Sequence, residues 1–178
     1  MDKTEITKLK DKTTKVDQNF EIKRYCSFYL ADRLFGVDIN SVKEINDEVQ
    51  FTYISHAPKV VRGYVNIRGQ IFLVLDLCYL MGIEKTISPE NGKLILFKTD
   101  ILENCGIFID GVGDIVDVRA DQIEDRRKNR ADKKLDIDRR KDFSQIGAGV
   151  CKLEHQLMVI IDPRKLPNAI EECVANRF

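Results

Sequence analysis

The sequence has no excess of either charge and no long apolar run, and each absence excludes a class of protein. Its 178 residues carry 29 lysines and arginines against 29 aspartates and glutamates, so no global charge draws the chain to nucleic acid or to an acidic membrane. The longest apolar run, residues 71–81, contains Asp76 and is shorter than the ~18 residues that a membrane span needs. The first twenty residues are charged throughout and have no apolar stretch, unlike a secretory signal peptide. We therefore expect no membrane insertion.

Sequence motifs for catalysis, phosphate binding and metal binding are also missing. The sequence has no Walker loop, no G-x-G-x-x-G, no G-x-S-x-G and no H-E-x-x-H. It has two histidines, and no two of its five cysteines lie within four residues of each other, so the closely spaced pairs of a zinc site are absent. Cysteine–histidine catalysis would need a pair such as Cys151 and His155, which flank a predicted hairpin turn. We expect no enzyme activity, no cofactor and no metal, and the scattered thiols suit a cytoplasmic location.

The hydrophobic pattern predicts a mostly β protein with many short strands. Apolar and polar residues alternate, or apolar residues form short runs, in segments bounded by turn residues, which is typical of strands. The predicted strands cover residues 26–30, 34–39, 50–54, 64–67, 71–75, 94–97, 105–109, 115–118, 149–153 and 157–161. Arg68-Gly69-Gln70 is predicted to form a tight hairpin turn.

Short helices are predicted where capping residues occur. Pro58 suits the first turn of a brief helix, and Asp76 is a natural N-cap for a helix that ends at Gly82. Asp162-Pro163 pairs an N-cap with a proline at the first helical position. We divide the chain into a flexible polar tail (1–23), a β domain (24–167) and a C-terminal tail or short helix (168–178). The β domain contains a charged insertion at residues 121–145.

The chain also contains an internal repeat. GYVNIRGQIFLVLD at residues 63–76 matches GVCKLEHQLMVIID at 149–162, with glycine, strand, turn, strand and aspartate at the same spacing. Residues 36–45 match residues 106–115 in the same way. The offsets are 86 and 70 residues, and the charged insertion accounts for the difference. From this repeat we infer two similar β-rich units. Because closure into a barrel removes exposed sheet edges, we expect each unit to be a small barrel.

One difference between the repeats affects charge. Glu44 and Arg68 occupy positions whose counterparts are Asp114 and Glu154, so only the first half can form an ion pair. The pair could be a surface salt bridge of little energetic weight, or a partly buried pair at an interface with a partner, where losing one charge costs more.

The same segments resemble the CheW family. The resemblance covers about residues 25–166 and rests on GVDINSVKEI (36–45), VVRGYVNIRGQIFLVLDL (60–77), GIFIDGVGDIVDV (106–118), IGAG (146–149) and LMVIIDPRKL (157–166), which occur in the family's order. The turn at residues 66–69 is the most specific piece. The resemblance implies two SH3-like, five-stranded barrels around a common core, and no catalysis.

The resemblance also implies partners and a site. Members of the family bridge the cytoplasmic tips of chemoreceptors and the regulatory domain of the histidine kinase CheA, and associate with membrane receptor arrays through these partners. Ile39, Val42 and Glu44 fall where the family lines its receptor-contacting groove. Positions whose change disturbs coupling in relatives match Gly63, Asn66, Arg68 and Gly69.

Two other functions stay open at this point. The chain could act in a chemosensory-like pathway that controls type IV pili or another output. It could also bind nucleic acid through the basic residues at 126–141, but five acidic residues are interleaved with the basic ones between 124 and 138, and only Phe143 nearby is aromatic, so a solvated loop explains this stretch as well. We therefore expect no nucleic-acid partner.

Overall fold

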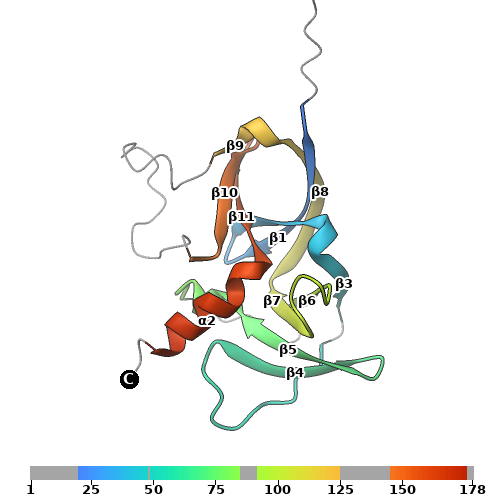
Figure 1. The fold of residues 1–178 in the computed structure, drawn as a ribbon, viewed down its shortest axis with the longest axis vertical. Helices are drawn as coiled ribbons and strands as arrows, with labels where there is room; N and C mark the ends of the chain where they lie inside the picture. The colour runs from blue at the N-terminus through green and yellow to red at the C-terminus, as the bar shows by residue number, and fades with distance from the viewer. Residues whose placement is uncertain (1–19, 48, 85–91, 125–144, 176–178) are drawn as a thin grey trace, which may run out of the picture.

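The chain folds into two small β-barrels (Figure 1), and one hydrophobic core runs through both. The computed structural model describes residues 20–47, 49–84, 92–124 and 145–175. One six-stranded sheet forms what we call the terminal barrel. Its strands, in spatial order, are β8 (Gly111–Arg119), β1 (Ile22–Leu30), β2 (Arg33–Asp38), β11 (Leu157–Ile161), β10 (Gly147–Lys152) and β9 (Ile123–Glu124).

A five-stranded sheet forms the second unit, which we call the central barrel. Its strands, in spatial order, are β3 (Val42–Asn46), β6 (Lys93–Phe97), β7 (Cys105–Ile109), β5 (Gln70–Asp76) and β4 (Val61–Ile67). The mostly β, double-barrel fold predicted from the sequence is therefore confirmed. The terminal barrel differs from a five-stranded unit only by β9, an extra strand of two residues.

The sequence repeat corresponds to a structural repeat, but its halves are not the two barrels. The match between residues 36–45 and 106–115 runs across the connections between barrels, from β2 to β3 and from β7 to β8. The strand order of the central barrel, β3-β6-β7-β5-β4, corresponds strand by strand to the order β8-β1-β2-β11-β10 in the terminal barrel. Even the parallel registers agree, because Val74 lies opposite Gly106 as Ile160 lies opposite Gly36. Each barrel is therefore built from strands that the repeat relates one by one.

We call β3 and β8 the crossover strands, because each follows a connection from one barrel to the other. Each barrel is closed by the chain segment that follows its crossover strand. After β3, Thr52 exchanges two backbone hydrogen bonds with Tyr64 of β4, at 2.8 and 2.9 Å. After β8, the chain pairs β9 with β10, so that Glu124 lies opposite Val150. Val150 is the repeat counterpart of Tyr64, so the two closures occupy equivalent places. Residues 50–54, predicted as a strand, form only the Thr52 bridge.

The core runs through both barrels, which explains why they form one unit. A large cluster joins Phe28, Phe35 and Val159 of the terminal barrel to Phe72 and Phe108 of the central barrel. A smaller cluster fills the rest of the terminal barrel. Its buried members are Tyr25, Leu34, Val118, Cys151, Met158 and Ile160.

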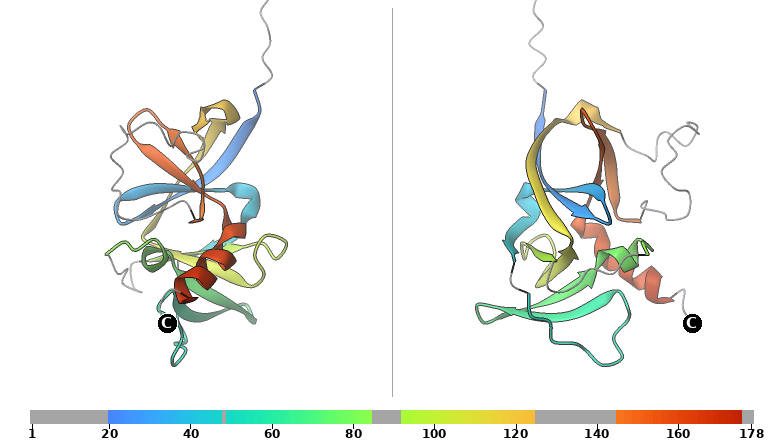
Figure 2. Two further views of the ribbon diagram at one scale, coloured as in Figure 1. Left: turned by 60° about the vertical axis from the view of Figure 1, so that its left-hand side comes forward. Right: turned by 180° about the vertical axis from the view of Figure 1, so that it is seen from behind.

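Two of the short helices begin at predicted caps. Asp76 accepts a hydrogen bond from the Tyr79 backbone N–H and starts α1 (Leu77–Leu80). Asp162 accepts one from the Arg164 N–H and starts the 3-10 helix η4 (Pro163–Lys165), which continues into α2 (Leu166–Ala175). Figure 2 shows α2 lying along the side of the central barrel, where it contacts α1.

Several predicted boundaries move. α2 begins at Leu166, inside the segment assigned to the β domain, and β1 begins at Ile22, inside the segment assigned to the tail. A turn at residues 59–60 replaces the helix predicted at Pro58. Most of the tail (1–19) and of the charged insertion (125–144) lies outside the described residues.

Candidate protein-binding site

The predicted site residues gather on two elements of the central barrel, the β4–β5 hairpin and the η1–β3 segment. The hairpin turns through Arg68 (φ 52°) and Gly69 (φ 85°), a two-residue turn with both central residues left-handed, as in type I′. Asn66 stabilises this turn because its Oδ1 accepts a hydrogen bond from the Gly69 backbone N–H at 2.8 Å. Asn66, Arg68 and Gly69 are all exposed at the hairpin tip.

The ion pair between repeat positions is present. Arg68 Nη1 lies 3.3 Å from Glu44 Oε2 and joins the hairpin tip to β3. The Asn46 amide donates a hydrogen bond to the other Glu44 oxygen at 3.2 Å. The Glu44 side chain is 22% exposed, whereas the Arg68 side chain is 84% exposed. The glutamate is therefore anchored, and the arginine offers most of its hydrogen-bonding surface to solvent.

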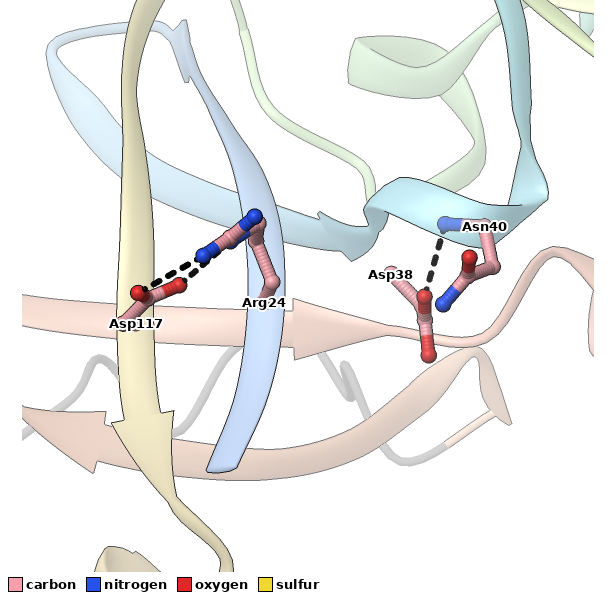
Figure 3. A network of polar contacts seen from close by, with 4 residues as sticks. All are labelled: Arg24, Asp38, Asn40 and Asp117. Atoms are coloured by element: carbon pink, nitrogen blue, oxygen red, sulfur yellow. Dashed lines mark hydrogen bonds and ion pairs between the residues drawn. The ribbon is translucent and has the colours of Figure 1, made fainter. Parts of the chain in front are cut away.

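Ile39 and Val42 lie just before Glu44, at the crossover between the barrels. Asp38 caps the 3-10 helix η1 (Ile39–Ser41) by accepting the Asn40 N–H at 2.8 Å, as Figure 3 shows. Val42 begins β3 opposite Phe97, and a β-bulge follows before Glu44. Ile39 and Val42 are both partly exposed. The cap and the bulge set where these side chains point.

Gly63 differs from the other predicted residues because it is buried. Its φ is +145°, and a Cβ there would lie 2.5 Å from the Thr52 carbonyl oxygen. Gly63 therefore permits Thr52 to close the barrel, which is a structural role. Its repeat counterpart Gly149 allows a similar approach, since a Cβ there would meet Ile123 Cγ2 at 2.6 Å.

Sequence reasoning missed the exposed apolar residues of β8. Ile115 is 61% exposed and Val112 is 37% exposed. Strand β8 pairs with β1, which also contacts η1, so both crossover segments adjoin the same strand. Beside Ile115, Arg24 of β1 and Asp117 of β8 form a bidentate ion pair at 2.7 and 3.1 Å (Figure 3). The repeat pattern was the available signal, because it maps Val42 onto Val112 and Ile45 onto Ile115.

The counterpart of the ion pair in the terminal barrel is acidic. Glu154 replaces Arg68, and Asp114 replaces Glu44. The Glu154–His155 turn also lacks the left-handed conformation of Arg68. Among the residues that the structure describes, only the central barrel therefore presents a cationic hairpin tip fixed to its crossover strand.

The arrangement of the cysteines does not resemble a catalytic site. Cys151 is 1% exposed and burial raises the pKa of its thiol, whereas the side chain of His155 is 92% exposed. Cys26, Cys78 and Cys105 are also buried. Within the described ranges, no three histidine, cysteine, aspartate or glutamate side chains are grouped to hold a metal ion. Among those same residues, no helix is long and apolar enough to cross a membrane.

These features define a double-barrel β domain with a mixed apolar and charged surface at its crossover segments. The profile of the CheW-like domain family matches residues 24–171. The chain therefore belongs to the CheW-like domain family.

Individual relatives agree with this assignment. The chain is 32% identical over 118 residues to a chemotaxis protein CheW of Klebsiella aerogenes, covering 66% of each chain. It is 26% identical to Protein PilI of Pseudomonas aeruginosa over 48% of this chain and 47% of that protein. Its fold is similar to the crystal structure of the scaffolding protein TtCheW from Thermoanaerobacter tengcongensis (TM-score 0.65, 27% identity, 79% of this chain and 89% of that chain). The alignments span 66% of the length of the Klebsiella aerogenes relative and 63% of the length of a probable chemotaxis protein CheW of Rhizobium etli, in each case slightly less than two thirds.

Proposed function

We propose that the chain is a non-catalytic coupling protein that joins the cytoplasmic tips of chemoreceptors to the regulatory domain of the histidine kinase CheA. The observation that carries this proposal is the match to the CheW-like domain family over residues 24–171. The similarity to a protein described as a scaffolding protein supports it. A location in the cytoplasm, at receptor arrays, is part of the same proposal.

The receptor-binding surface comprises Ile39 and Val42, the apolar residues of β8, and the Glu44–Arg68 pair at its edge. Aliphatic side chains surrounded by charged and amide groups are typical of protein interfaces. Asn66 and Gly69 complete the polar edge at the hairpin tip. A helical receptor tip lying across this surface would place apolar side chains against Val42 and Ile115.

The test is co-sedimentation of the purified protein with the CheA regulatory domain, with and without a receptor cytoplasmic fragment. We expect a ternary complex with micromolar affinity, and Val42→Asp should abolish receptor binding while the fold survives. Because Val42 also packs against the core, Ile115→Asp tests the same surface at a residue with less to lose on substitution. Ile22→Asp is the matched control, since Ile22 is 57% exposed and pairs with Arg119 at the far end of β1.

Each outcome has a distinct meaning. A wild-type protein that binds neither partner would refute the coupling function. Normal receptor binding by both Val42→Asp and Ile115→Asp would leave the function standing and refute the surface.

A second candidate has a specific observation in its favour. The similarity to Protein PilI, which is not named for chemotaxis, favours an adaptor in a chemosensory-like pathway that controls type IV pili or another output. The same co-sedimentation with kinase and receptor fragments from a second chemosensory system of the organism would separate the two.

A further inference from the structure

The hairpin tip is held to the barrel by a second set of contacts, separate from the Glu44–Arg68 ion pair. Lys43 Nζ of β3 donates a hydrogen bond to Gln70 Oε1 at 2.6 Å. Gln70 Nε2 donates in turn to Asn104 Oδ1 at 2.7 Å. Gln70 is the first residue after the turn, so it ties the tip both to β3 and to the loop before β7.

The chemistry of these groups fixes their arrangement. An ammonium group only donates hydrogen bonds, so Lys43 selects the oxygen of the Gln70 amide and leaves the nitrogen to donate to Asn104. Lys43 Nζ also lies 4.8 Å from the centre of the Phe72 ring, which favours its position over β5. Asn104 is held in a left-handed conformation (φ 44°), and its carbonyl accepts the Leu73 N–H at 2.8 Å. One glutamine therefore connects two elements that are otherwise far apart in the sequence.

In the described part of the terminal barrel, the repeat positions cannot form an equivalent chain of contacts. The repeat counterparts of Lys43 and Asn104 are Gly113 and Leu34, and neither has a polar side chain. Only Gln156 matches Gln70. The contacts between Lys43, Gln70 and Asn104 therefore occur at the same hairpin tip that carries the Arg68–Glu44 ion pair.

We infer that Lys43, Gln70 and Asn104 form a latch that positions the hairpin tip on β3, so that Arg68, Asn66 and Glu44 meet a partner as one preorganised surface. This inference rests on the proposed coupling function and adds positioning residues to it. Lys43 and Gln70 are exposed, so breaking the latch should barely change stability. It should instead make the partner order the tip on binding, and the ordering cost of one side chain corresponds to an affinity loss of about 2- to 12-fold.

The experiment compares full-length wild type with Gln70→Leu, which removes both hydrogen bonds, and with Lys43→Met, which keeps the aliphatic stem over Phe72. Backbone order at Gly69 and side-chain order at Arg68 are measured by ¹⁵N relaxation without any partner. We expect Gly69 to fall from about 0.85 toward about 0.6 in order parameter, with an unchanged melting temperature. Affinity for the receptor fragment and for the CheA regulatory domain is then measured by titration.

The controls separate positioning from a general loss of surface contacts. Lys93→Met removes the 2.6 Å contact between Lys93 and Asp47 in the same barrel without touching the hairpin, and should change neither tip order nor affinity. The double variant Lys43→Gln with Gln70→Lys exchanges the two side chains and keeps a donor and an acceptor. It should restore both the order of the tip and the affinity.

Two results would overturn the latch: unchanged tip order in Gln70→Leu, or a disordered tip with wild-type affinity. If the wild type binds neither partner, the coupling function fails, and the order measurement still decides whether the latch exists.

Discussion

Replacing Gly63 with alanine tests whether this residue acts through the fold or through a partner. At φ +145°, a side chain occupies a region that glycine alone adopts readily, at a cost of roughly 1–3 kcal/mol. The new Cβ would also lie 2.5 Å from the Thr52 carbonyl oxygen, and the backbone of the closing segment cannot move away as a flexible side chain would. Such overpacking costs a further 1–3 kcal/mol, roughly. We therefore expect Gly63→Ala to lose about 2–6 kcal/mol of unfolding free energy.

Gly69, in the turn that follows the same strand, provides the matched control. Its φ of +85° also disfavours a side chain, but a Cβ there would have no heavy atom within 4 Å. Gly69→Ala should therefore cost only the backbone term, roughly 1–2 kcal/mol. The assay is urea unfolding followed by far-UV circular dichroism, with the midpoint and slope of each variant compared.

The test compares the loss of unfolding free energy in Gly63→Ala with the loss in Gly69→Ala. If Gly63→Ala loses no more free energy than Gly69→Ala, the steric argument at Thr52 is wrong and a partner contact has to be considered for Gly63. If the steric argument holds, Gly63→Ala should bind partners in proportion to its folded fraction, with unchanged affinity per folded molecule.

Two further predictions concern charge and thiol reactivity. For the ion pair between Arg68 and Glu44, whose charged atoms lie 3.3 Å apart, Arg68→Glu should weaken the coupling of receptor to kinase, and Glu44→Arg combined with Arg68→Glu should recover part of it. The effect on stability should be about 0–1 kcal/mol and should shrink as salt is added. If the free-energy changes of the two single variants simply add up in the double variant, the pair does not interact. Burial raises the pKa of Cys105 to about 12, so a thiol reagent at pH 8 should label the partly exposed Cys173 quickly in the native protein and the four buried thiols only after unfolding; rapid native labelling of Cys105 would contradict its burial.

The features that sequence predicted well are those with a local cause. Asp76 and Asp162 are followed by residues that can form a first helical turn, so each caps a helix as expected. Arg68-Gly69 lies between two apolar runs of matched length, so the hairpin register follows from the turn. The possibility of an ion pair from Glu44 to Arg68 followed from comparing the repeats, because only the first half carries opposite charges at these two positions.

The features that sequence missed depend on pairing between distant segments. The parallel pairing of β2 with β11 places the first hairpin in the terminal barrel, and no local signal in residues 22–38 indicates a partner at 157–161. Residues 50–54 have strand-like composition, but only Thr52 reaches an edge of β4. The strand around Ile115 gives no local signal of its exposure, since an apolar residue in an alternating strand is expected to face the core; the only signal was the repeat, which maps Ile45 onto Ile115.

The repeat explains how one fold can offer two different surfaces. Backbone features are shared between the barrels: the parallel registers agree, and a bulge occurs before Gly63 as before Gly149. Side chains at the hairpin tips are not shared, because a left-handed Arg68 paired to Glu44 has an acidic, differently shaped counterpart at Glu154. Since the core and the strand order constrain the backbone, changes at the turns and crossover strands alter a binding surface at little cost to folding. A partner that recognises the cationic tip of the central barrel would therefore be repelled by the equivalent tip of the terminal barrel, which fixes its orientation on an otherwise pseudo-symmetric protein.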